Sequence, residues 1–340
     1  MVAAVREVLG SEVLQGTGEL GGGLISEGEV FLTDVGKVFI KWNRKEKALD
    51  MYKGETAGLQ QLGASGVVRV PEPLAAVELP GGGAALVLEY LPMKDLRHHS
   101  LNLARQLARL HLQNPLATTH PGGSRVGHGD ARSTFVPHFG FHSPTPCGYI
   151  LQDNTWCDDW QTFFSRKLQQ QIAMIETEYG DREVLELWSR LQTQMPRFFA
   201  GVEVLPSLLH GDLWMGNSAE TQQGPVLFDP GVFYGHHEYD SAVSALVPPG
   251  FGESFWAEYH AAVPKAPGWA TRQKLYRLFH KFNQWNHFGR QYRTGYWGFT
   301  GLAVIGYWGL TGLAVIGYWG LTGLAVIGYW DLTGLAVIGY

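Results

Sequence analysis

The sequence predicts an α+β fold of two lobes, the first rich in strands and the second rich in helices. Two patterns carry this prediction: apolar runs bounded by glycine turns in the first quarter of the chain, and helix-period apolar spacing after it. The length of 340 residues is enough for two ordinary lobes. We therefore expect lobes at residues 1–91 and 92–294, followed by a segment of different character at 295–340.

The first lobe alternates strands with glycine turns. Apolar runs predict strands that begin at Val13, cover Ile25–Leu32 and cover Lys37–Trp42, with turns at Gly21–Gly23 and Asp34–Gly36. Helical spacing follows, and then another apolar strand: the ranges are Glu46–Leu62 and Ala84–Tyr90. Pro71 and Pro73 are predicted to close this helix and the loop after it, and Pro80–Gly83 is predicted as the turn that enters the last strand.

The second lobe is predicted to consist of helices joined by loops. Apolar spacing predicts helices over Leu101–Leu112, Asp158–Tyr179 and Asp181–Gln194, the last of them ended by Pro196. A stretch rich in Gly, Thr, Ser and Pro predicts a long surface loop over Asn114–Pro137.

Composition excludes several classes of protein. Hydrophobic residues make up 45 % and charged residues 17 %, which indicates a folded globular chain. A net charge of −5 argues against nucleic acid as a partner. The cysteines, Cys147 and Cys157, are too few for a disulfide framework, and the first residues lack a signal-peptide pattern. We expect a cytoplasmic protein, with mitochondria as the alternative.

The segment from Gly295 repeats a nearly identical eleven-residue unit. Asp331 is the only charged residue of the whole segment. Three interpretations compete: a membrane span, a repeat architecture, and an extension without an evolved fold. Glycine in every unit weakens a helix, and the charged positions of a coiled coil are absent. We favour the extension, which has β propensity and is prone to aggregate, and we expect no association with a membrane.

Two features of the first lobe suggest phosphate binding. Gly21, Gly22 and Gly23 could lay backbone N–H groups over a nucleotide, although a plain hairpin turn would explain them equally well. Lys41 lies inside an apolar strand, where an unpaired charge is costly to bury, so we expect Glu55 of the next helix as its partner. The alternative is a solvated lysine on an edge strand.

The most specific pattern is His210-Gly211-Asp212 with Asn217 five residues after the aspartate, followed by Asp229. Phosphoryl transfer needs a carboxylate near the attacking hydroxyl and oxygen ligands for Mg²⁺. Asp212 suits the first role, and Asn217 and Asp229 suit the second. This order and spacing are those of the protein-kinase fold, which uses ATP and Mg²⁺. No Ala-Pro-Glu motif follows Asp229, which favours a small substrate over a protein kinase.

At these residues the sequence resembles the fructosamine-3-kinase and ketosamine-3-kinase family, which belongs with the aminoglycoside and choline kinases. The resemblance runs from about Val5 to Arg293. The motifs that carry it include GGGLISEG, VFIKWN, FGFHSPTPCGYI, LLHGDLWMGN, FDPGVFYGHHEYD and WNHFG. It implies an aminoglycoside-phosphotransferase type of fold and ATP-dependent phosphorylation of the 3-hydroxyl of fructosamines, ribulosamines or psicosamines. The substrates would be small ketosamines and glycated proteins, and the unstable product would free the amine.

The resemblance also implies roles for single residues. Asp212 would accept the proton, Asn217 and Asp229 would bind Mg²⁺, and Lys41 with Glu55 would hold the phosphates. The backbone of Glu89, Tyr90 and Leu91 would form the hinge that meets adenine. Trp214 and His287 would face the sugar and the amine; packing inside the helical lobe is the alternative for both.

The sequence departs from the family in places that leave other hypotheses open. Leu24 stands where many relatives carry cysteine, so a redox switch there is not expected, and Asp229-Pro230-Gly231 replaces the usual Asp-Pro-Ala. The oligomeric state is not predicted. The alternatives are an ATP-binding pseudokinase with an aberrant C-terminus and a kinase for another small hydroxylated amine.

Overall fold

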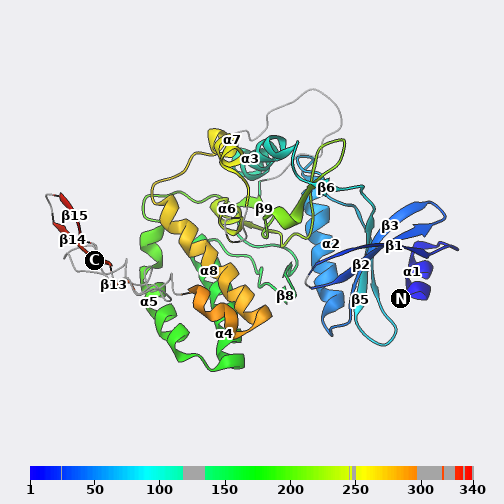
Figure 1. Cartoon of the computed structure of the whole chain (residues 1–340), viewed down its shortest axis with the longest axis horizontal. Helices are drawn as coiled ribbons and strands as arrows, with labels where there is room; N and C mark the ends of the chain where they lie inside the picture. Colours follow the sequence, from blue (N-terminus) through cyan, green and yellow to red (C-terminus); the bar gives the residue numbers. More distant parts are fainter. Residues whose placement is uncertain are drawn as a thin grey trace.

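Figure 1 presents the computed structural model, in which a sheet-rich lobe at the N-terminal end lies beside a helical lobe. The structure describes residues 1–23, 25–117, 135–244, 246, 250–296, 316–317, 326–331 and 334–338, with side chains up to Arg293. The predicted α+β architecture of two lobes is confirmed. The lobe boundary at residue 91 remains a prediction.

The sheet-rich lobe is built on five antiparallel strands in the order β1-β2-β3-β5-β4. The strands are β1 (Gln15–Gly22), β2 (Glu27–Thr33), β3 (Gly36–Asn43), β4 (Pro73–Glu78) and β5 (Ala84–Glu89). The predicted strand runs are confirmed, and β4, which begins at Pro73, was not predicted. β4 is an edge strand, where the N–H that proline lacks is not needed for pairing.

Helices cover both faces of this sheet. Along β5, Leu86 and Leu88 face the core shared with α2 (Ala48–Ala64), whereas Val87 packs in a second cluster with Val5 of α1 (Val2–Leu9). Strand residues alternate between faces, so a strand covered on both sides is a continuous apolar run. α2 confirms the predicted helix, whereas α1 was not predicted.

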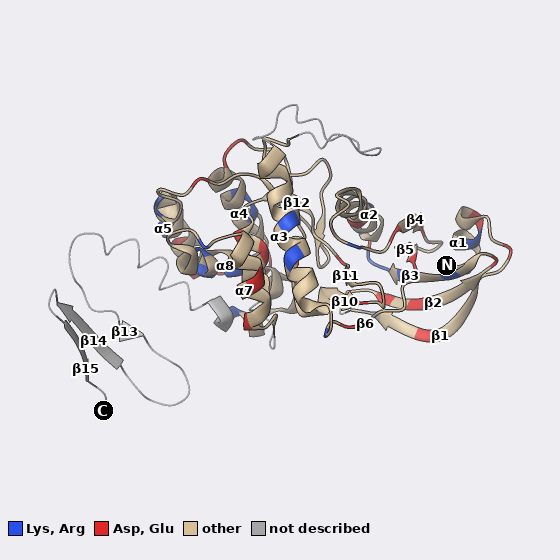
Figure 2. Ribbon diagram, turned by 90° about the horizontal axis from the view of Figure 1, so that it is seen from above, with Lys and Arg blue, Asp and Glu red and all other residues tan. Residues whose placement is uncertain are grey.

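α2 lies between the sheet and the helical lobe in both views (Figures 1 and 2). Its glycines allow this close packing. A Cβ atom on Gly54 would lie 2.3 Å from the carbonyl oxygen of Pro144, and one on Gly58 would lie 3.0 Å from Val232. Glu55 follows Gly54 on this helix, and its carboxylate contacts Lys41 of β3.

The helical lobe contains α3 (Ser100–Ala117), α4 (Trp160–Tyr179), α5 (Arg182–Phe198), α6 (Glu238–Val243), α7 (Glu253–Ala262) and α8 (Trp269–Phe288). Short strands join them: β6 (Lys94–Asp95), β7 (Pro146–Cys147), β8 (Ile150–Leu151), β9 (Ser207–Leu209), β10 (Ser218–Glu220), β11 (Pro225–Leu227) and β12 (Phe233–Gly235). Asp159 and Asp181 cap α4 and α5 by accepting the N–H groups of Thr162 and Val184.

Two predicted helix ends are wrong. α5 continues through Pro196 to Phe198, because the buried side chains of Met195 and Phe198 hold the last turn. α3 continues into the predicted loop as far as Ala117. Within this extension, the buried amide of Asn114 donates to the carbonyls of Val136 and Pro206. The part of that loop at residues 118–134 lies outside the described residues.

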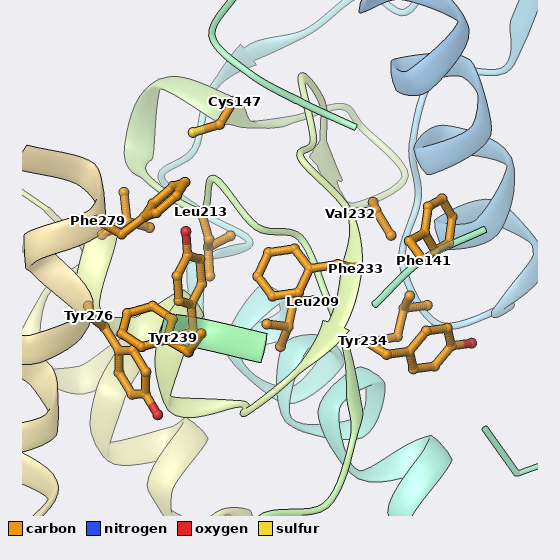
Figure 3. Packing of buried hydrophobic residues seen from close by; sticks show 14 of the residues in the cluster. Phe141, Cys147, Leu209, Leu213, Val232, Phe233, Tyr234, Tyr239, Tyr276 and Phe279 are labelled. Atoms are coloured by element: carbon orange, nitrogen blue, oxygen red, sulfur yellow. The ribbon is translucent and has the colours of Figure 1, made fainter. Parts of the chain in front are cut away.

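Buried aromatic side chains form the centre of the helical lobe. Phe233, Tyr239, Tyr276 and Phe279 surround Leu209 and Leu213, the apolar residues on either side of the His210–Asp212 segment (Figure 3). This packing fixes both ends of the segment that carries the predicted catalytic residue.

The repeat segment is described only in part. Its strands β13 (Ile316–Gly317), β14 (Val326–Asp331) and β15 (Gly334–Ile338) pair with one another and, within the described ranges, with no other strand. Of the helices that the structure describes, none has the length and apolar character needed to cross a membrane.

Candidate active site

Lys41 joins the two lobes through a pair of carboxylates. Its Nζ atom lies 2.6 Å from Oε1 of Glu55 on α2 and 2.8 Å from Oδ1 of Asp229 in the helical lobe. Lys41 and Glu55 are 6 % and 4 % exposed. Burial acts against the charge, but Asp229 and Glu55 together hold the pKa of Lys41 above its usual value. The partner expected for Lys41 is therefore present, and Asp229 is a second one.

The sheet places glycines beside this lysine. Gly28 of β2 pairs with Lys41 on one side and with Gly21 of β1 on the other. A Cβ atom on Gly21 or Gly28 would lie 2.9 or 2.5 Å from the ring of Phe39, so a side chain there would force this ring to move. Gly21 and Gly22 end β1, and Gly23 is the first residue of the connection to β2, which begins at Glu27, so the connection lies two residues further along the chain than predicted.

Asp212 lies next to Asn217, as their spacing predicts. The Asn217 amide donates to Oδ2 of Asp212 at 3.0 Å and to its carbonyl oxygen at 2.9 Å. Burial raises the pKa of Asp212 to about 7 against the hydrogen bond from Asn217, and the charges of Asp229 and Asp240 add to the rise. A carboxylate with a pKa near neutrality is suited to accept a proton from a hydroxyl group.

The residues predicted to bind Mg²⁺ fit that ion by their chemistry. The carboxylate of Asp229 is 46 % exposed, and its backbone has a φ of 51°, an uncommon conformation for a residue with a side chain. Asn217 turns its amide nitrogen to Asp212, which leaves the amide oxygen as the group that can ligate a metal. Carboxylate and amide oxygens are ligands that Mg²⁺ accepts.

Asp240 was missed by the sequence analysis. This fully buried residue of α6 accepts the backbone N–H groups of His210 and Gly211, each at 2.8 Å, and contacts Nε2 of His111 at 3.2 Å. These bonds hold the backbone that leads into Asp212. The acidic residue at the end of the HHEYD motif, close after Asp229, was the available signal.

Tyr149 connects the helical lobe to the loop after β3. Its hydroxyl accepts the backbone N–H of Lys47 at 3.0 Å, and Nζ of Lys45 lies 4.3 Å from its ring centroid. Its own N–H donates to Nε2 of His287 at 2.7 Å, and Nδ1 of His287 bonds the carbonyl of Asn283. Both nitrogens of His287 are therefore engaged inside the fold. The substrate contact expected of this residue stays a prediction.

Trp214 is half-buried beside the catalytic loop. A Cβ atom on Gly216 would lie 2.2 Å from its indole ring, so the ring rests directly on this glycine. The place of Trp214, two residues from Asp212, is compatible with the predicted contact to a sugar, which the structure does not test.

The predicted hinge is held by side-chain contacts. Glu89 forms an ion pair with Arg69 and accepts the backbone N–H of Glu72 at 3.1 Å, and the Tyr90 hydroxyl donates to Glu19 at 3.0 Å. Leu91 is half-buried. These contacts occupy the side chains of Glu89 and Tyr90, and the adenine contact expected of the backbone of this segment stays a prediction.

Kinase-like phosphotransferases are defined by a lysine paired with a helix glutamate, an aspartate in the catalytic loop and a further aspartate, here just after β11. The family model for fructosamine kinase matches residues 1–299, and the chain belongs to the fructosamine kinase family. It is 45 % identical over 303 residues to a ketosamine-3-kinase of Mus musculus, covering 86 % of this chain and 96 % of the relative.

Two further comparisons agree with this assignment. A chloroplastic protein-ribulosamine 3-kinase of Arabidopsis thaliana is 36 % identical over 279 residues, covering 82 % of this chain and 79 % of the relative. The crystal structure of a candidate fructosamine-3-kinase from Haemophilus somnus superposes with a TM-score of 0.71 at 21 % identity, covering 90 % of this chain and 97 % of that one. The fold and family expected from the sequence are thus confirmed.

Proposed function

We propose that this protein transfers the γ-phosphoryl group of ATP to the 3-hydroxyl of ketosamines. The single observation that carries the proposal is the ion-paired Lys41, Glu55 and Asp229 beside Asp212, in a chain of the fructosamine kinase family. The pseudokinase alternative is not favoured, because the aspartate proposed as proton acceptor, the phosphate-binding lysine and the side chains proposed to bind Mg²⁺ are all present.

The residues divide the reaction between them. Lys41 binds the phosphates, and Asp212 orients the 3-hydroxyl and takes its proton as the new O–P bond forms. The bond from the γ-phosphorus to the bridging oxygen breaks, and ADP leaves. Asn217 and Asp229 would hold Mg²⁺, which supplies positive charge to the phosphates when bound.

The nucleotide site belongs to the same proposal. We assign the phosphates to the space under Gly21, Gly22 and Gly23, and the adenine to the backbone of Glu89–Leu91. The support is the register that pairs Gly28 with Lys41 and Gly21 with Gly28. The side-chain contacts that fix Glu89 also support the assignment.

We further propose that the acceptors include ketosamines on protein lysines. The name of the Arabidopsis thaliana relative, protein-ribulosamine 3-kinase, supports this extension. Trp214 would cover the sugar carbons and attract the protonated amine through its ring face.

The free thiols of Cys147 and Cys157 support a cytoplasmic location.

A matched substrate panel tests the activity. The full chain is incubated with ATP, Mg²⁺ and either a fructosyl-amine or a ribulosyl-amine, with choline and an aminoglycoside as controls, and phosphorylated product is followed by ³¹P NMR. We expect product from at least one ketosamine and none from the controls. Nucleotide binding without turnover on any of the four compounds would instead support the pseudokinase.

A further inference from the structure

Three potential metal ligands converge behind the catalytic loop, apart from the predicted Mg²⁺ pair. They are Cys147 of β7, Asp212, and His280 of α8, and one ligand atom from each lies within 4.8 Å of the other two. Cys147 is 2 % exposed and His280 is 4 % exposed. Figure 3 shows Cys147 above Leu213 and Phe279. Leu213 is the sequence neighbour of Asp212, and Phe279 is the sequence neighbour of His280.

Two unpartnered polar atoms lie in the same region. Among the described residues, neither Nε2 of His280 nor the hydroxyl of Tyr239 has a hydrogen-bond partner. Both side chains are at least nine-tenths buried, and their rings lie 5.1 Å apart. Figure 3 shows the Tyr239 hydroxyl pointing toward Leu213 and Phe279. Buried polar groups without partners are costly, and a bound ion is one of the ways to satisfy them.

The ligand types select the metal. Thiolate, imidazole and carboxylate are the donors of zinc sites, whereas Mg²⁺ prefers oxygen ligands alone. We propose that Cys147, Asp212 and His280 form a zinc site, with the Tyr239 hydroxyl or a water molecule in the fourth position.

A second cluster of histidine and carboxylate side chains serves as a contrast. His236, His237 and Glu238 also come within ligand distance of one another. The Glu238 carboxylate, however, receives two hydrogen bonds from the buried guanidinium of Arg272, at 2.8 and 2.7 Å. A metal there would have to displace this ion pair, so we assign no site to it.

Nearby charge limits the affinity of the proposed site. The ammonium of Lys167, buried in the same core, interacts electrostatically with Cys147 and donates to Asn154 at 3.2 Å. When protonated, Lys167 favours the thiolate that the metal requires but repels the metal itself; burial, however, lowers the pKa of Lys167 to about 7 and raises the pKa of the Cys147 thiol. We therefore expect zinc to bind reversibly and more weakly than in a structural zinc site.

Occupation of this site would block phosphoryl transfer, a consequence that rests on the proposed function. Zinc bound to the Asp212 carboxylate would prevent it from accepting the proton of the sugar hydroxyl. The site thus offers inhibition by a metal that is distinct from the activating Mg²⁺.

Cobalt spectroscopy tests binding without any assay of activity. Co²⁺ is added to the full chain in excess Mg²⁺, and zinc is then used to displace it. We expect a thiolate-to-cobalt charge-transfer band that is lost in Cys147→Ser, weakened at least about tenfold in affinity in His280→Gln, and kept in the control Cys157→Ser. Circular dichroism confirms that the variants fold. A parent protein without the band, or the same band in Cys147→Ser, would overturn the proposal.

Turnover then tests the consequence. Zinc in excess Mg²⁺ should inhibit ketosamine phosphorylation by the parent, and the zinc concentration for half inhibition should rise at least about tenfold in Cys147→Ser, each variant being compared with its own zinc-free rate. Normal turnover without a cobalt band would reject the zinc site and leave the proposed function intact. A cobalt band without turnover would support the zinc site and reject the proposed function.

Discussion

Lys41 of the sheet-rich lobe and Asp229 of the helical lobe form an ion pair of 2.8 Å across 188 residues of sequence. Glu55 contacts the same lysine at 2.6 Å, so one side chain fixes the helix α2 and the predicted metal-binding aspartate together. The two ion pairs therefore connect the sheet, α2 and the segment that carries Asp229 at one point.

Replacement of this lysine tests the phosphate clamp. In Lys41→Met we expect kcat/KM for ATP to fall about 10²–10³-fold, because a cation aimed at developing charge is lost. Glu55 would also lose its buried partner, which costs about 3 kcal/mol or more of stability. Steady-state kinetics and urea denaturation measure both effects, and Lys53→Met on the exposed face of α2 is the control. Unchanged ATP kinetics would reject the clamp.

The pH profile reports on the proton acceptor. Asp212 acts as a base only when ionised, and burial raises its pKa to about 7. Below that value kcat/KM should fall about tenfold for each pH unit, and above it the profile should level off. Rates measured from about pH 5.5 to 8.5 on a ketosamine check this limb. A flat profile over the acid half of this range would contradict the assignment of Asp212.

Gly216 provides a test of Trp214 that keeps the tryptophan in place. The substitution Gly216→Ala adds a methyl group 2.2 Å from the indole and must displace the ring. We expect KM for the ketosamine to rise about two- to fivefold, as loss of a cation–π contact would produce. KM for ATP should stay constant. Equal KM values for the ketosamine in both proteins would indicate that the indole only packs.

The repeat segment should be dispensable. Arg293 is anchored to the start of α5, with its guanidinium 2.6 Å from Asp181 and 2.8 Å from Glu183. A chain that ends at Thr294 keeps these ion pairs, so its free energy of unfolding should match that of the full chain within about 0.5 kcal/mol. Comparison of melting curves and turnover decides the point, and loss of either in the shortened chain would show that the repeats take part in the fold.

Much of the site was accessible from sequence because its residues come from local patterns. The spacing from Asp212 to Asn217 lies within one loop, and Lys41 stood out as a charge within an apolar strand. Asp240 ends the HHEYD motif, but no spacing in the sequence relates it to His210 or Gly211. It acts on backbone N–H groups 30 residues away, a contact that only the packing of α6 creates.

The wrong predictions about the fold have similar causes. Pro73 lies on an edge strand, which tolerates a missing N–H, whereas α5 continues through Pro196 because buried Met195 and Phe198 hold its last turn. Tyr149 was not singled out, because its interlobe bond to Lys47 joins residues 102 positions apart. Tertiary contacts, rather than local propensity, decided each of these cases.

The most direct test of the central claim compares the parent with Asp212→Asn on one ketosamine. With saturating ATP and Mg²⁺, we expect kcat for formation of the 3-phosphate to fall about 10²–10⁴-fold. Nucleotide affinity by calorimetry should stay near that of the parent, because Asp212 acts at the acceptor hydroxyl. Ordinary turnover in Asp212→Asn would contradict the account of the active site.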